Sequence, residues 1–215
     1  NSATYRQGSQ PSEAAREHDP ENIWLSHFQR RRVDAEELRD SVLAAAGTLN
    51  LKMGGRPVVV PLSKEELYNM IGRPGDMWVL TDDATEHTRR SIYLLQKRTF
   101  RLPMMEVFDS PDTMLTCARR DYSTSAPQSL TLLNSSFTLE QARLAAKRLV
   151  DAEKADAGLI RAAWRQVLAR DPSPGESAKA IAFLQAQSAN AGSREDAATE
   201  LMRGLFNVNE FLYID

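Results

Sequence analysis

AGLIRAAWRQVLARDPSPGESAKAIAFL, residues 157–184, contains the signals that establish the fold class of this chain. Apolar residues recur at helical spacing in both halves of the segment: Leu159, Ile160, Ala163, Trp164, Val167 and Leu168, and then Ala180, Ile181, Phe183 and Leu184. Between the halves, Asp171-Pro172 ends the first helix, because proline cannot continue it. Ser173, Pro174 and Glu176 then have the spacing of a capping box with proline at the first helical position. The segment therefore predicts two consecutive helices.

The same pattern extends to both sides of this segment. Leucines at 130–133 predict a short helix that ends near Asn134, and Thr138 with Gln141 predicts the capping box of the next helix. Its buried face would carry Leu139, Ala142, Ala146 and Leu149. Another helix is expected over 194–206, and the apolar residues 211–214 are expected to be packed against the protein. Residues 127–215 therefore predict a helical bundle.

Residues 1–126 are less regular. Asp34 and Glu37 form the expected capping box of a helix over 35–46, which Gly47 closes. Short helices are expected after Ser63, with Leu67, Met70 and Ile71 on one face, and from Pro103. Residues 109–126 are expected to be a loop. Residues 91–101, SIYLLQKRTFR, predict a strand, and residues 58–60 are a candidate for a second one.

We therefore predict a mainly α fold. An irregular N-terminal lobe, residues 1–126, would contain short helices and at most a small sheet. It would pack on a C-terminal helical bundle, residues 127–215, so that the two form one compact unit.

Composition excludes several classes of function. The chain of 215 residues has a net charge of −2 and a pI near 6.0, which argues against nucleic-acid binding. The sequence has no apolar run long enough to predict a membrane span. Cys117 is the single cysteine, so an intrachain disulfide, a Cys-x-x-Cys-His haem site and a cysteine-rich zinc site are excluded. Because Asn1 stands where a start methionine would, we interpret the chain as part of a larger protein.

A cluster of basic residues is the strongest candidate for a binding site. Between residues 89 and 120, seven cationic side chains accompany three acidic ones. The candidate anion-binding residues are Arg89, Arg90, Arg98, Arg119 and Arg120. The competing interpretation pairs these arginines with acids elsewhere in the chain, such as Asp34, Glu36 and Asp40. We favour pairing, because the whole chain is slightly acidic.

No pattern of catalytic or metal-binding residues is recognisable, and no cofactor is expected in this chain. Cys117 lies beside two arginines, which would activate a thiol, but a lone cysteine is more often an inert packing residue. A pair of Cys117 with His87 is conceivable, and the three histidines do not have metal-ligand spacing. Asp82-Asp83 and the pair Asp109 and Asp112 are interpreted as turn and cap residues.

Several segments together resemble a known family. These are SATYRQ at 2–7, RVDAEELRD at 32–40, RRSIY at 89–93, FDSP at 108–111, CARR at 117–120, QSLTLLN at 128–134 and EFLYID at 210–215. They resemble the C-terminal domain of unknown function of planctomycete cytochrome-c-type proteins, the PSD family. The resemblance implies that the domain follows a haem-c-like module and another uncharacterised domain in an exported protein. It supplies no catalytic residues, and the haem-binding motif is absent here.

Two functions remain open at this stage. The first is a non-enzymatic accessory or interaction domain of an exported cytochrome-c-type protein, periplasmic or secreted, whose partners are the other domains of the parent protein, possibly its haem-c module. The alternative is a domain that binds or processes anions or sulfated polysaccharides through the arginine cluster. An open arginine cluster would favour the alternative, and internally paired arginines would favour the first function. The sequence leaves the oligomeric state open.

Overall fold

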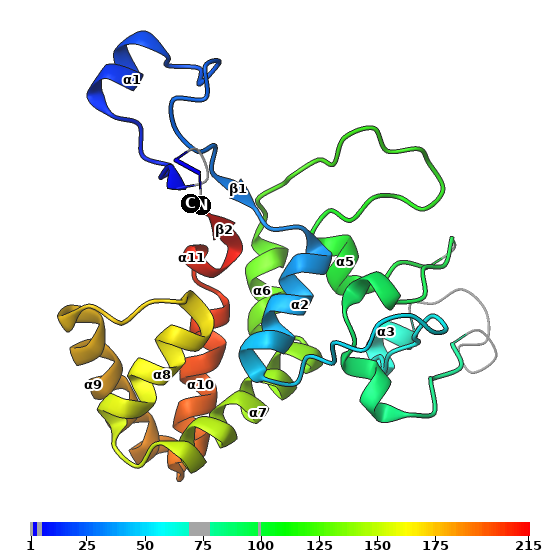
Figure 1. The fold of residues 1–215 in the computed structure, drawn as a ribbon. Helices are drawn as coiled ribbons and strands as arrows, with labels where there is room; N and C mark the ends of the chain where they lie inside the picture. The colour runs from blue at the N-terminus through cyan, green and yellow to red at the C-terminus, as the bar shows by residue number, and fades with distance from the viewer. Residues whose placement is uncertain (1, 4–5, 69–77, 99) are drawn as a thin grey trace.

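The computed structural model describes residues 2–3, 6–68, 78–98 and 100–215, and within them it is predominantly helical (Figure 1). The helices are α1 (Glu13–His18), α2 (Ala35–Ala46), α3 (Lys64–Tyr68), α5 (Pro103–Val107), α6 (Ala126–Asn134), α7 (Ser136–Ala152), α8 (Asp156–Leu168), α9 (Pro174–Ala191), α10 (Arg194–Phe206) and α11 (Asn209–Leu212). Two 3₁₀ helices, η2 (Ala84–Thr88) and η3 (Ser91–Tyr93), lie between α3 and α5. Strands β1 (Arg31–Arg32) and β2 (Tyr213–Ile214) pair antiparallel. The predicted mainly α fold is confirmed.

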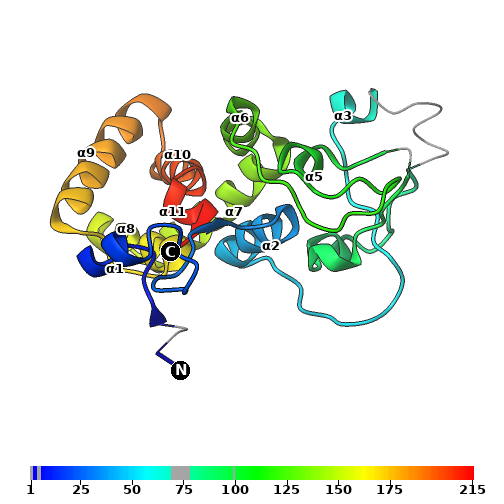
Figure 2. The same ribbon diagram turned by 90° about the horizontal axis from the view of Figure 1, so that it is seen from above.

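The C-terminal helices pack around α10. Helix α10 contacts α7 and α9, and α8 also packs on α9. Both α7 and α10 bury alanines completely, among them Ala142, Ala146, Ala197 and Ala198, and such short side chains let two helices approach closely. Seen from above, α8 and α9 lie at one end of the molecule and α3 and α5 at the other, with α2, α6 and α7 between them (Figure 2).

Most of the predicted caps are present. The Ser173 hydroxyl accepts from the Glu176 amide at 3.3 Å, and the Glu176 carboxylate accepts from the Ser173 amide at 2.7 Å. The capping box of α2 is formed as expected, and Gly47 closes this helix in the left-handed conformation, φ 67°.

The predicted start of α7 is wrong by one turn. Ser135, and not Thr138, is the N-cap, because its hydroxyl accepts from the Thr138 amide at 3.2 Å. Thr138 is fully buried inside the first turn of the helix. Both residue types can cap, and the earlier cap adds one turn, Ser136–Thr138, to the start of the helix.

The strand predicted over residues 91–101 is also wrong. Its first three residues form η3, and in the described part the remainder makes only isolated bridges, Val58 to Leu94 and Lys97 to Phe100. Residues 58–60 likewise form no strand beyond that bridge. The amide and hydroxyl of Ser91 donate to Asp40 on α2 at 2.7 and 2.8 Å, which binds the segment to a helix instead of a sheet. The end of the helix expected after Ser63, at Met70 and Ile71, lies outside the described residues.

One hydrophobic core crosses the division proposed at residue 126. Leu38 and Val42 of α2 belong to the same buried cluster as residues of α6, α7, α8 and α10. The C-terminus is packed as expected: Phe211 and Leu212 are buried, and the Val33 amide donates to the Leu212 carbonyl at 2.9 Å. The two lobes therefore share their core and a short sheet. Within the residues described, no helix has the length and apolar character needed to cross a membrane.

Replacing Phe211 by alanine tests the packing of the C-terminus. The Phe211 ring lies 5.5 Å from the Phe206 ring, centroid to centroid, and is 9% exposed. We expect Phe211→Ala to lower the free energy of unfolding by about 3 kcal/mol, and the melting temperature by about 6–12 °C. The control Ile214→Ala, at a half-exposed position, should cost less than about 1 kcal/mol. Equal losses in the two variants would contradict this packing role.

Candidate functional site

Arg89 lies inside the fold and not at an open anion site. Its side chain is 1% exposed, and its guanidinium pairs with Glu86 at 2.9 Å. It also donates to the carbonyls of Lys52, at 3.1 and 3.2 Å, and Gly54, and it stacks on the ring of Tyr93 at 3.9 Å. The guanidinium of Arg89 therefore holds neighbouring segments of the chain together and is not available to an external anion.

Arg90 and Arg120 also pair with carboxylates of this chain. Arg120 makes two hydrogen bonds to Glu36, at 2.7 and 3.1 Å, and lies 3.5 Å from Asp34. Arg90 lies 3.7 Å from Asp40. The three acids are those that the charge balance of the sequence singled out as partners.

Arg98 and Arg119 differ from the other three. Both are exposed, and neither pairs with a carboxylate of a described residue. The assignment of the five arginines to anion binding stays a prediction, and in this structure only these two side chains are available for it.

Two further arginines, Arg32 and Arg39, were not identified as site residues. Both are 5% exposed. Arg32 donates to the carbonyls of Ser123 and Phe108, at 2.6 and 3.1 Å, and to Asp109 at 2.7 Å. The sequence signal that indicates burial of Arg39 is its position one turn before Leu43, on the apolar face of α2.

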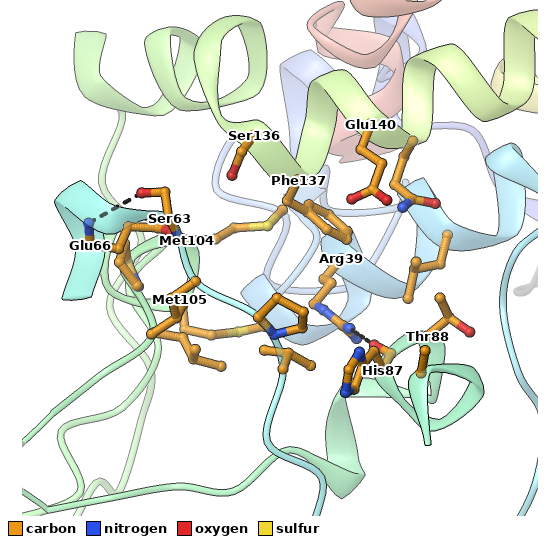
Figure 3. Close-up of a pocket in the computed structure, with 18 residues that line it drawn as sticks. Arg39, Ser63, Glu66, His87, Thr88, Met104, Met105, Ser136, Phe137 and Glu140 are labelled. Carbon is orange, nitrogen blue, oxygen red and sulfur yellow. Dashed lines mark hydrogen bonds between the residues drawn. The ribbon is translucent and has the colours of Figure 1, made fainter. Parts of the chain in front are cut away.

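Arg39 lies in the wall of a cavity (Figure 3). The cavity has a volume of about 460 Å³ and lies among α2, α5, the start of α7, η2 and the segment that carries Ser63. Its lining is mainly apolar and includes Leu43, Val60, Pro61, Leu62, Leu102, Pro103, Met104, Met105 and Phe137. The polar lining residues are Arg39, Ser63, Glu66, His87, Thr88, Ser136, Glu140 and Gln141. Ligand sites typically combine such apolar walls with a few polar groups.

The guanidinium of Arg39 is held by backbone carbonyls. It donates to the carbonyls of His87 and Arg89 at 2.7 and 2.9 Å, and to the Ser91 hydroxyl at 3.2 Å. The ring of Phe137 lies 5.4 Å from it. Burial lowers the pKa of Arg39 to about 10, and the nearby Asp40 opposes this shift.

Three other polar groups of the cavity have partly free hydrogen-bonding capacity. The His87 Nε2 donates to the Thr81 carbonyl at 2.7 Å, which leaves Nδ1 as an acceptor in the neutral ring. Gln141 is 4% exposed, and its carbonyl oxygen accepts from Thr48 at 2.6 Å, whereas its amide nitrogen donates to no described residue. Glu140 is exposed and forms no ion pair within the described part of the chain.

The other residues considered as candidates from the sequence make local structural contacts. Cys117 is exposed in the loop before α6, where its thiol donates to the Arg119 carbonyl at 3.1 Å, and no hydrogen bond joins it to His87. Asp83 caps η2, and Asp112 accepts from the Met114 amide at 2.8 Å, as expected for turn residues. Among the residues described, no group of three or more His, Cys, Asp or Glu side chains is placed to hold a metal ion.

Comparison with protein families identifies the family of the chain. A family profile described as "PSD1: Protein of unknown function (DUF1553)" matches residues 1–184. The matched range ends inside α9, so the resemblance noted at residues 210–215 lies outside it. No curated protein and no solved structure matches the chain.

The Arg32–Asp109 pair makes a testable contribution to the pH dependence of stability. Burial raises the pKa of Asp109, but the Ser123 amide and the Arg32 guanidinium lower it further, so that its pKa lies below the usual value of 3.8. A lowered pKa stabilises the fold above about pH 4, and this contribution disappears as the pH falls through the lowered pKa.

Asp109→Asn should therefore lower the free energy of unfolding by about 2 kcal/mol at pH 7, because it leaves Arg32 without its counter-charge. The stability of this variant should also fall less steeply than that of the parent protein below about pH 4. Denaturant unfolding at several pH values measures both effects. The control is Asp112→Asn, and a curve for Asp109→Asn that matches this control would contradict the assignment.

Proposed function

The chain belongs to the PSD1 family of proteins of unknown function (DUF1553), and we propose that it is a non-enzymatic interaction domain of a larger, exported cytochrome-c-type protein. The observation that carries the proposal is a turn that displays Ile23, Trp24 and Leu25, which we call the apolar tip. Their exposed fractions are 72%, 75% and 64%. Contiguous exposed apolar side chains are typical of contact surfaces between proteins.

The apolar tip is held in a defined conformation by Asp19. This residue is 5% exposed, and its carboxylate accepts from the Ile23 amide at 2.6 Å and from the Trp24 amide at 3.2 and 3.3 Å. On the other side, the Asn22 side chain donates to the His27 carbonyl at 2.9 Å. A carboxylate that accepts two successive amides fixes the turn that presents these side chains.

Backbone strain supports a role in binding. Asn22 and Leu25 have positive φ angles, 53° and 54°. Asparagine tolerates this conformation, but for leucine it costs roughly 1 kcal/mol, and such strain is concentrated at binding sites. The backbone conformation of this turn is therefore energetically unfavourable, and no other part of the described structure covers the apolar side chains that it presents.

The position of the apolar tip also suits contact with another domain. Helix α1 and the turn that follows it project beyond the helical body (Figure 1). We assign the partner to another domain of the same parent polypeptide, which the family resemblance would make a haem-c module or its neighbour. The resemblance also supports a planctomycete source and a periplasmic or secreted location. The alternative, binding or processing of sulfated polysaccharide, would depend on Arg98 and Arg119 alone, and we therefore place it second.

Site-specific photo-crosslinking in the full-length parent protein tests this function. A photoreactive amino acid at position 24 should form crosslinks to a domain outside residues 1–215, and mass spectrometry identifies the site. The control is position 130, where Leu130 is 55% exposed on α6 and isolated from the apolar tip. Crosslinks from position 24 that stay within residues 1–215, or that equal those from position 130, would contradict the proposal.

A further inference from the structure

The cavity beside Arg39 has the size and lining of a small-molecule site. Its volume of about 460 Å³ lies in the range of roughly 300–1,000 Å³ that is usual for such sites. Leu62, Leu102, Met104 and Phe137 contribute hydrocarbon, thioether and aromatic surface to its wall. The flexible side chain of methionine adapts to the shape of a ligand. An occupant of this cavity would therefore have an apolar body.

The buried polar groups of the cavity are mainly hydrogen-bond donors. A guanidinium has five N–H groups, and the bonds of Arg39 to described residues use three of them. The amide nitrogen of Gln141 adds donors that no described residue accepts. Both side chains are at least nine-tenths buried, but their unpaired nitrogens keep some solvent access, so these N–H groups remain available to a ligand. These two residues therefore favour a ligand that brings acceptor oxygens.

The charge of Arg39 is only partly compensated. The nearest carboxylate is that of Asp40, at 3.9 Å from the guanidinium, and Asp40 also accepts two hydrogen bonds from Ser91 and faces Arg90 at 3.7 Å. Moving a charge into a protein without a close counter-charge is unfavourable. An anionic group next to Arg39 would supply that counter-charge.

The two glutamates of the cavity wall have less influence on this preference. Glu140 is exposed, so water and salt screen its charge. One oxygen of Glu66 accepts from the Ser63 amide at 2.7 Å in the cap of α3. In Figure 3 the Glu140 carboxylate lies beside the Phe137 ring, on the side of Arg39, and Glu66 lies at the far side of the cavity, beyond Met104. The deeply buried charge is therefore that of Arg39.

We propose that this cavity binds a small monocarboxylic acid with an aliphatic or aromatic body. The carboxylate would accept from Arg39 and Gln141, and the body would lie against Met104 and Phe137. A planar carboxylate matches the fork of a guanidinium, and its single charge is easier to desolvate in an apolar cavity than the double charge of a phosphate. The site is separate from the apolar tip, so its test does not depend on the interaction function.

Titration with matched eight-carbon probes tests the proposal. Octanoate, octylamine and octyl phosphate share an apolar chain and differ in their charged group. With ¹³C-methyl-labelled methionine, octanoate should shift the resonances of Met104 and Met105 saturably. It should also bind at least about tenfold more tightly than either of the other two probes, which is a difference of about 1.4 kcal/mol.

Three variants assign the binding to the cavity. Met104→Trp should fill the space and abolish the octanoate-dependent shift of Met105, whereas Glu140→Gln should leave octanoate affinity unchanged or slightly higher. Arg39→Lys should weaken octanoate binding at least about tenfold, because lysine lacks the planar fork. Since Arg39 also holds the loop at residues 87–91, its melting curve must be measured; if this variant does not fold, Met104→Trp and Glu140→Gln decide the question.

Several results would overturn the proposal. These are tighter binding of octylamine or octyl phosphate than of octanoate, octanoate binding that survives Met104→Trp, loss of octanoate binding in Glu140→Gln, and the absence of a saturable shift with octanoate up to its solubility limit.

Discussion

Hydrogen bonds from buried arginines to backbone carbonyls are the interaction on which the irregular lobe depends. A buried carbonyl needs a donor, and in most folds a helix or a sheet provides it. In the described part of the N-terminal lobe the ladder of a sheet is almost absent, and arginine side chains take its place. Arg32 bonds carbonyls at 108 and 123, Arg39 bonds those at 87 and 89, and Arg89 bonds those at 52 and 54. Each guanidinium thereby fixes loops that are distant in sequence.

The same interaction relies on a property of arginine, of which the sequence has 21 residues against 6 lysines. A guanidinium presents several N–H groups in one plane and can bond two or three oxygens at once, whereas an ammonium group is a compact point charge. Arginines also bond to backbone carbonyls in the helical bundle. Arg148 donates to the Ala46 carbonyl at 2.6 Å, and Arg203 donates to the Leu133 carbonyl at 2.6 and 3.0 Å. The arginine cluster that suggested a binding site is thus largely part of the framework.

The sequence predicted the helices from α8 to α10 well, because their caps and apolar spacing are local signals. Local signals failed where the outcome depends on distant residues. Residues 91–101 have the composition of a strand, but Asp40 of α2 binds Ser91, and only single bridges form. The cavity could not be predicted, since its wall combines residues from five separate parts of the chain. Charge balance predicted that the arginine cluster pairs with acids such as Glu36, and Arg120 does so. The burial of Arg39 could only have been inferred from its place on the apolar face of α2.

The free energy of unfolding of Arg89→Lys, compared with that of Arg98→Lys, tests the framework role of the arginines most directly. Both changes keep the positive charge. At position 89 lysine cannot replace the bonds to Lys52, Gly54 and Glu86, so we predict a loss of at least about 2 kcal/mol. At the exposed position 98 the change should stay within about 0.5 kcal/mol. Equal stabilities for the two variants would show that the charge of Arg89 suffices and that its hydrogen bonds to the loops do not hold the lobe together.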